Sequence, residues 1–294
     1  MARAEARRGA PAVSRIAVGI DGSPGAVMAL DWAGAEAASY GARLVVVGVW
    51  TPGGWARTVL VSRAAALAAA DRAVAEVAVT HPSVLVERLI EKGEPALVLV
   101  RVSESVEMLV VGTRGLGPVR GLPFGSVSHA CLANARCSVT VVRPGHGAGS
   151  PPKTIVVGVD GSPGGEQVLD WAAAEAMRFG AVLDVVNAWT YPGTAGYVAL
   201  GDADVPPHAR QVVSMALEYL AERSPSVPTR ADIQRGPPLV ALAEASREAD
   251  LLVLGSRGFG AFRGMRIGAL SEHLARQVSC SVVVVRDGGE HAVA

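Results

Sequence analysis

The chain of 294 residues has few cysteines, little lysine and no excess of charge of either sign. Its three cysteines, Cys131, Cys137 and Cys280, lack metal-ligand spacing, and an odd number is a poor disulfide framework. We therefore expect three small buried thiols and a reducing, cytoplasmic environment. A formal net charge of zero argues against broad nucleic-acid binding and gives no basis for binding an acidic membrane surface. No apolar run approaches the roughly 18 residues of a membrane span.

Two common nucleotide-binding motifs are also missing. A Walker A loop needs G-x4-G-K-[ST], and the two lysines, Lys92 and Lys153, do not stand in such a context. A dinucleotide fingerprint needs G-x-G-x-x-G after the first strand, and the DGSPG turns of this chain lack it. Any nucleotide site must therefore use another arrangement.

What the chain does have is the length and apolar content of two globular domains. About half of the residues are apolar, and roughly 100–200 residues per domain is the usual size. Residues 1–13 carry Arg3, Arg7 and Arg8 but no apolar core, so we expect a disordered tail rather than a secretory signal.

The two halves repeat one another in order. IAVGIDGSPG from Ile16 returns as IVVGVDGSPG from Ile155, and LVVGTRGLG from Leu109 returns as LVLGSRGFG from Leu252. GHGAGSPPK, from Gly145, has the composition of a linker. We therefore predict two domains of the same kind, residues 14–146 and 147–294.

Each half alternates short apolar runs with longer amphipathic ones. The predicted strands of the first half are Ile16–Ile20, Leu44–Val49, Val84–Ile90, Met108–Val111 and Val139–Val142. The predicted helices between them are Pro24–Tyr40, Ala64–Thr80, Pro95–Glu104 and Phe124–Ala135. The predicted strands of the second half are Ile155–Val159, Leu183–Ala188, Thr229–Gln234, Leu251–Leu254 and Val282–Val285. Continuous Val/Leu/Ile strands indicate parallel sheets covered on both faces, so the predicted fold is α/β, with two tandem doubly wound, five-stranded, Rossmann-like domains. Such sheets bind ligands at the carboxyl ends of their strands, where the strand order reverses.

An aspartate stands at the end of the first strand in each half. Asp21 and Asp160 each precede a glycine turn and a helix, where a carboxylate can accept hydrogen bonds from a nucleoside or help hold a divalent cation. The alternative is that these aspartates only shape a turn, or that the following serines, Ser23 and Ser162, cap the helices.

The fourth strand runs into a glycine-rich loop with the spacing G-x2-G-x9-G in both halves. The glycines are Gly112, Gly115 and Gly125 in the first half, and Gly255, Gly258 and Gly268 in the second. Glycines at a strand end let backbone N–H groups approach an oxyanion, and the last glycine opens a helix whose N-terminus favours phosphate. The hydroxyls of Ser126 and Ser128 can add hydrogen bonds. The alternative is a flexible loop followed by an ordinary helix cap.

The loop between these glycines also repeats its arginines. Arg114 matches Arg257, and Arg120 matches Arg263, so they can close over a polyphosphate; the alternative is that they are simply solvated. His129 and His273 follow the loops in equivalent helices, where we expect surface or packing roles rather than general-base chemistry. The sequence therefore predicts no catalytic residues.

The strand-end aspartate followed by G-x2-G-x9-G-[ST] resembles the ATP-binding form of the universal stress protein domain. The resemblance covers two copies, Ser14–Pro144 and Lys153–Asp287. It implies an adenine nucleotide lying across the strand ends, together with Mg²⁺ or Mn²⁺ that Asp21 and Asp160 can help to hold. The implied nucleotide-binding residues of the first half are Asp21, Val49 (against adenine), Gly112, Gly115, Gly125, Ser126 and Ser128. Those of the second half are Asp160, Ala188, Gly255, Gly258, Gly268 and Ser271.

The second copy departs from the family pattern at one position. Ala269 stands where the pattern has Ser or Thr, so one hydroxyl is lost. A hydrogen bond contributes about 0.5–1.5 kcal/mol, so we expect weaker binding there, with Ser271 compensating in part. The family also implies that the two domains pair through Val139–Val142 and Val282–Val285, and that the chain forms a homodimer.

The resemblance implies a nucleotide-dependent stress-response or regulatory protein rather than a dedicated enzyme. The sequence leaves two alternatives open. One is a slow ATPase or a transferase of the adenine-nucleotide α-hydrolase type. The other is an interaction scaffold that has lost its nucleotide.

Overall fold

The computed structural model describes residues 14–51, 61–115, 124–144, 152–190, 205–258 and 267–286. The first half contains β1 (Arg15–Ile20), α2 (Pro24–Tyr40), β2 (Arg43–Trp50), α3 (Arg63–Thr80), β3 (Val86–Lys92), α4 (Pro95–Val102), β4 (Met108–Gly112), α5 (Ser126–Asn134) and β5 (Ser138–Val142). The second half contains β6 (Thr154–Gly158), α6 (Gly165–Phe179), β7 (Val182–Trp189), α7 (Pro207–Arg223), β8 (Thr229–Arg235), α8 (Pro238–Ala245), β9 (Leu251–Gly255), α9 (Ala269–Gln277) and β10 (Ser281–Val285). The predicted α/β fold is confirmed.

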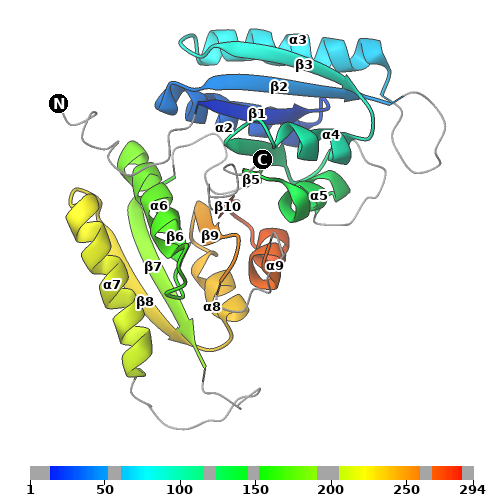
Figure 1. Cartoon of the computed structure of the whole chain (residues 1–294). Coiled ribbons are helices and arrows are strands. Elements are labelled where there is room, and N and C mark those ends of the chain that lie inside the picture. The colour runs from blue at the N-terminus through cyan, green and yellow to red at the C-terminus, as the bar shows by residue number, and fades with distance from the viewer. Residues whose placement is uncertain are drawn as a thin grey trace, which may run out of the picture.

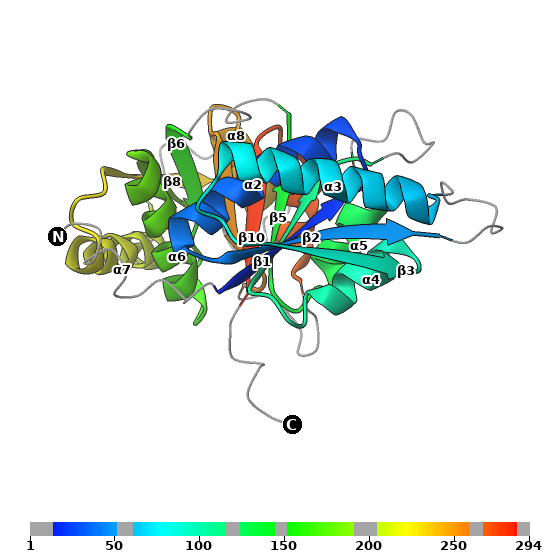
Figure 2. The ribbon, with the colours of Figure 1, turned by 90° about the horizontal axis from the view of Figure 1, so that it is seen from above.

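The ten strands form one sheet in the order β3-β2-β1-β4-β5-β10-β9-β6-β7-β8. Strands within each half are parallel, whereas β5 and β10 pair antiparallel, with Val283 opposite Thr140. Figure 2 shows β5 and β10 near the centre, with β2 and β3 to one side and β6 and β8 to the other. Because each half reverses its direction of winding between its first and fourth strands, the switch points lie at β1/β4 and β6/β9.

Helices cover both faces of the sheet (Figure 1). One face carries α2, α3, α6 and α7, whose alanine and leucine side chains pack on residues such as Ile16 in β1 and Leu183 in β7. The other face carries α4, α5, α8 and α9 and buries the three thiols, Cys131, Cys137 and Cys280, all free as expected. The central strands are buried on both sides, as their continuous apolar runs predicted.

Arginines at the ends of the last strands hold the two halves together. The Arg143 guanidinium donates to the carbonyl of Ala275 in α9 at 2.5 Å, and that of Arg286 donates to the carbonyl of Leu132 in α5. A cation near the C-terminal end of a helix is favoured by the helix dipole. Each half therefore caps a helix of the other.

Several boundaries differ from the predictions for local reasons. Helix α5 begins at Ser126 rather than at Phe124, because Gly125 is its N-cap. Helix α4 ends at Val102 rather than at Glu104. Strand β3 runs from Val86 to Lys92, two residues later than predicted, because a turn in which Val84 N–H donates to the His81 carbonyl comes first.

The alternative in which the two serines cap the following helices holds for Ser23 and is wrong for Ser162. Ser23 Oγ accepts from Ala26 N–H at 3.2 Å and caps α2, but α6 begins only at Gly165, with Gly164 as its N-cap and no side-chain cap. Gly165 replaces Ala26 of the first half, and glycine is a poor helix former, so the helix starts later. Ser162 therefore precedes the helix without capping it.

Residues 1–13 and most of the proposed linker lie outside the described residues, as do Arg120 and Arg263. Among the helices of the described part of the chain, none has the length and apolar character that crossing a membrane requires.

Candidate functional site

The aspartate after β1 and the glycine loop after β4 meet at the switch point of the first half. A Cβ added to Gly115 would overlap Asp21 Oδ2, so the carboxylate lies directly against this glycine. The other carboxylate oxygen, Oδ1, accepts from Ser23 N–H at 2.9 Å, which fixes the side chain across the turn. The structure therefore brings together two residues 94 positions apart that sequence reasoning had placed in one site.

Backbone contacts between α2 and β4 close the base of the site. A Cβ on Gly112 would lie 2.5 Å from the Gly25 carbonyl oxygen, and one on Gly25 would lie 2.6 Å from the Arg114 carbonyl oxygen. Ser23 Oγ donates to that same Arg114 carbonyl at 3.3 Å. The start of α2 and the end of β4 are thus packed backbone against backbone, which only glycine permits.

Helix α5 presents an N-terminus without a side-chain cap beside this loop. Its N-cap, Gly125, has no side-chain oxygen, and its first residue, Ser126, is exposed. The amides of a first helical turn have no partner within the helix, and they carry partial positive charge. This end of α5 is therefore chemically suited to an anion.

Two predicted phosphate ligands instead hold the loop in shape. Gly125 N–H donates to the Thr113 carbonyl at 2.7 Å, and Ser128 Oγ donates to the Gly112 carbonyl at 2.6 Å. Ser128 is also buried. These two bonds fix the start of α5 against the end of β4, and leave Ser126 as the exposed hydroxyl.

Val49 lies level with Asp21, because Gly48 pairs with Ile20 in the register of β1 and β2. The Val49 side chain is only 8% exposed and packs in the core under α4. An arginine that sequence reasoning missed also borders the turn: Arg72 Nη2 of α3 lies 3.9 Å from the position of a Cβ on Gly22. Arg72 stands in mid-helix with no motif around it, so only the fold reveals it.

The second half repeats the same contacts with small differences. A Cβ on Gly258 would overlap Asp160 Oδ2, and Asp160 Oδ1 accepts from Ser162 N–H at 2.9 Å. Ser271 Oγ donates to the Gly255 carbonyl at 2.7 Å, the counterpart of the Ser128 bond. Ala188, near the end of β7, is partly exposed.

Helix α9 likewise begins without a side-chain cap. Its N-cap is Gly268, whose N–H donates to the Ser256 carbonyl at 2.7 Å, and Ala269 is its exposed first residue. The start of α9 therefore keeps the backbone bond that Gly125 makes at the start of α5, and loses the exposed hydroxyl.

The two histidines lie behind the loops rather than in them. His129 Nε2 of α5 is 2.8 Å from Glu272 Oε1 of α9, so it contacts the other half of the molecule. His273 is exposed. Within the described ranges, no three His, Cys, Asp or Glu side chains cluster as a metal site.

Comparison with known proteins agrees with this architecture. Residues 12–143 and 152–286 each match the profile of the Universal stress protein family. The chain is 30% identical over 283 residues to a universal stress protein of Mycolicibacterium smegmatis, covering 92% of this chain and 96% of that protein. It is 29% identical over 306 residues to the universal stress protein Rv1996 of Mycobacterium tuberculosis, covering 95% and 96%. The crystal structure of a universal stress protein from Archaeoglobus fulgidus has the same fold, with a TM-score of 0.67 at 19% identity over 94% of this chain and 97% of that one. The chain therefore belongs to the universal stress protein family and carries two of its domains in tandem.

Proposed function

We propose that this protein binds ATP at the carboxyl ends of its strands and acts as a nucleotide-dependent stress-response regulator. The main support for the proposal is the geometry at the N-terminus of α5. Its N-terminus has no side-chain cap, its first residue is exposed, and it adjoins a loop whose Gly115 lies against the Asp21 carboxylate. The same arrangement recurs at α9 with Gly258 and Asp160.

The phosphate chain would rest on the first-turn amides of α5. Ser126 would add a hydroxyl, and the exposed Arg114 and Arg72 would offset the negative charge from either side. Gly125 and Ser128 would support the phosphates indirectly, because their polar hydrogens hold the loop in place.

The nucleoside would lie toward β2, beside Asp21 and the end of the strand at Val49. A divalent cation fits this arrangement only together with the phosphates, because the described residues offer no ready set of three metal ligands. Asp21 Oδ2 would then be the protein oxygen nearest to Mg²⁺ or Mn²⁺, which supplies charge neutralisation for the phosphates.

The second site would bind more weakly than the first. Ala269 offers its amide but no hydroxyl, and the Ser271 hydroxyl already donates to Gly255. We therefore expect no compensation from Ser271, in contrast to the partial compensation predicted from the sequence. The loss of one hydrogen bond weakens binding by about 0.5–1.5 kcal/mol, which is several-fold in affinity.

Binding rather than rapid turnover is the function we propose. Hydrolysis needs a group that positions the attacking water. The histidine that follows the first loop, His129, contacts Glu272 instead. Phosphate release from ATP should accordingly be slow, and the bound nucleotide would act by selecting a partner or a homodimeric state.

The first test is chromatography of the nucleotide released from freshly purified protein, followed by calorimetric titration with ATP and Mg²⁺. We expect two binding events of unequal affinity. Gly115→Val places a side chain onto Asp21 and should weaken the tighter event at least about tenfold, or about 1.4 kcal/mol. Gly258→Val should do the same to the weaker event.

Gly165→Ala is the matched control, because a Cβ there meets nothing within 4 Å. It should leave both events unchanged, and circular dichroism should show all three variants folded. The proposal is wrong if the wild-type protein carries no nucleotide and gives no titration heat, which would favour a scaffold without nucleotide. Rapid metal-dependent phosphate release would favour an enzyme.

A further inference from the structure

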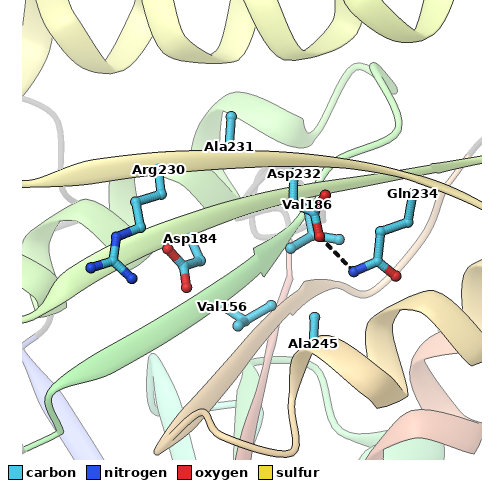
Figure 3. Close-up of a pocket in the computed structure, with 8 residues that line it drawn as sticks. All are labelled: Val156, Asp184, Val186, Arg230, Ala231, Asp232, Gln234 and Ala245. Atoms are coloured by element: carbon cyan, nitrogen blue, oxygen red, sulfur yellow. Dashed lines mark hydrogen bonds between the residues drawn. The ribbon is translucent and has the colours of Figure 1, made fainter. Parts of the chain in front are cut away.

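A charged pocket opens on the second half of the sheet, away from the loops described above. Its cavity of about 230 Å³ lies between β6, β7 and β8 and the end of α8. Val156, Val186 and Ala245 give it an apolar wall, and Asp184, Asp232 and Gln234 give it a polar one. Figure 3 shows these side chains around one opening.

The pocket lies nearer the starts of the strands than the candidate nucleotide site does, although Gln234 of its lining pairs with Ala188 of that site. Asp184 stands near the start of β7, which runs from Val182 to Trp189, whereas the nucleotide site lies beyond the ends of the strands. Ala245 is the last residue of α8, so the negative end of that helix dipole faces the same region. A ligand here would leave the glycine loops uncovered.

The internal repeat shows that this pocket is particular to the second half. Asp184 occupies the position that Val45 has in the first half. In the pairing of β7 with the edge strand β8, Asp184 is the second residue, as Val45 is in the pairing of β2 with the edge strand β3. In the same way Asp232 stands where the first half has Leu89. Val45 is 1% exposed in the core, and Leu89 packs against that core. Two neighbouring positions thus carry apolar side chains in the first copy and carboxylates in the second.

Asp232 is exposed, whereas a carboxylate oxygen buried as in Asp184 is costly unless something neutralises it. Asp184 Oδ1 is buried and has no hydrogen-bond partner, and burial raises the pKa of this carboxyl group above its ordinary value. Nearby Arg230 opposes that rise and Asp232 adds to it. Asp232 itself accepts a hydrogen bond from Gln234 at 2.6 Å. Two carboxylates against one guanidinium leave the pocket short of one positive charge.

We propose that the pocket binds a small aliphatic cation that carries an ammonium or guanidinium group. The charged head would lie between Asp184 and Asp232 and donate to the buried Oδ1 of Asp184. The aliphatic part would contact Val156, Val186 and Ala245. A cavity of about 230 Å³ is smaller than the usual drug-sized pocket, which restricts the ligand to a short chain.

The test is calorimetric titration and ligand-observed NMR of the full chain with 1,4-diaminobutane and agmatine, at about 0.15 M salt to screen diffuse attraction. We expect saturable binding of one cation, and none of the neutral analogue 1,4-butanediol. Asp184→Asn should weaken binding at least about tenfold, because a charged hydrogen bond is lost. The double variant Asp184→Val, Asp232→Leu restores the residues of the first half and should abolish it.

Glu222→Gln on α7 is the matched control, since it removes one exposed negative charge of the same half outside the pocket. It should bind as the wild type does. Binding that survives the double variant would overturn the proposal. The absence of saturable binding to either cation would also overturn the proposal. In that case the charged side chains of the pocket would serve instead to protect the exposed edge strand β8 from pairing with another chain. Both results are independent of whether ATP binds.

Discussion

At the scale of single residues, the candidate site depends on close backbone approaches that exclude side chains. Gly112 and Gly25 illustrate this, because a Cβ on Gly112 would lie 2.5 Å from the Gly25 carbonyl oxygen. The neighbour is backbone, so it cannot rotate away as a flexible side chain can. The equivalent Gly255 is less crowded: a Cβ there would lie 3.2 Å from the Arg257 carbonyl oxygen.

Gly112→Ala should therefore destabilise the protein by about 2 kcal/mol, within the usual range for overpacking. Gly255→Ala, its counterpart in the second half, should cost less than about 1 kcal/mol, because its neighbours need to move only slightly. Urea unfolding followed by circular dichroism measures both. Equal costs for the two variants would show that the close approach at Gly112 relaxes readily.

The sequence predicted the partners of this site better than it predicted their roles. Asp21 and Gly115 could be paired because both follow the carboxyl ends of predicted parallel strands and the family resemblance places both in one site. Ser128 and Gly125 have the right spacing for phosphate, but their polar hydrogens are donated to the carbonyls of Gly112 and Thr113. The acceptor to which a group donates its hydrogen depends on the folded geometry, and it cannot be predicted from the spacing of residues along the sequence. Arg72 was missed for the related reason that α3 brings it to the turn only after folding.

At the scale of elements, the two copies differ where a helix begins. Ser23 is buried, caps α2 through Ala26 N–H, and also donates to the Arg114 carbonyl. Its counterpart Ser162 stands before a helix that begins only at Gly165. The DGSPG sequence is identical in the two copies, but the helix caps differ because Ala26 follows it in the first copy and Gly165 in the second.

Ser23→Ala should cost about 1 kcal/mol of stability, the usual value for losing a serine cap. Ser162→Ala should change stability by no more than about 0.5 kcal/mol, because Ser162 does not cap α6 and substitutions away from such features generally have small effects. Thermal or urea unfolding of the two variants checks the difference. A similar loss in both would mean that Ser162 supports its turn in a way that the capping geometry does not explain.

At the scale of the whole molecule, the two halves meet in a buried charged cluster as well as at β5 and β10. Glu36 of α2 and Glu175 of α6 occupy equivalent places in the repeat, and a single arginine, Arg178, donates to both, at 2.8 Å and 2.5 Å. Tyr40 hydroxyl donates to Glu175 at 3.4 Å. Serine stands at position 39, where an equivalent second arginine would be, so two carboxylates share one cation.

The pairing of β5 with β10 was foreseeable from the family resemblance, but this cluster was not. The repeat LDWAGAEA and LDWAAAEA shows both glutamates, yet their alanine-rich surroundings indicate only a helix. Glu36 is fully buried, and its Oε2 has no hydrogen-bond partner. Which helix faces meet across two domains depends on how the domains pair, and that is a property of the assembled sheet.

This cluster should make the stability of the protein depend on pH. Burial, and then the neighbouring Glu175, raise the pKa of Glu36 well above its ordinary value of 4.5, despite the opposing effect of Arg178. Between pH 4.5 and the raised pKa of Glu36, the folded protein keeps a proton on this carboxyl group that the unfolded chain releases. Stability is therefore greatest below about pH 4.5 as far as this group is concerned, and falls as pH rises toward the folded pKa. The slope is at most about 1.4 kcal/mol per pH unit for one proton.

Glu36→Gln removes this titration while keeping an oxygen that can accept from Arg178. Its free energy of unfolding, measured in urea from pH 5 to pH 8, should fall less steeply with pH than that of the wild type, and should equal or exceed it at pH 8. Glu76→Gln, at an exposed position on α3, is the control and should retain the wild-type slope. If Glu36→Gln kept that slope and were less stable at pH 8, Glu36 would be ionised in the folded protein. The two halves would then be joined by a charged triad rather than by a shared proton.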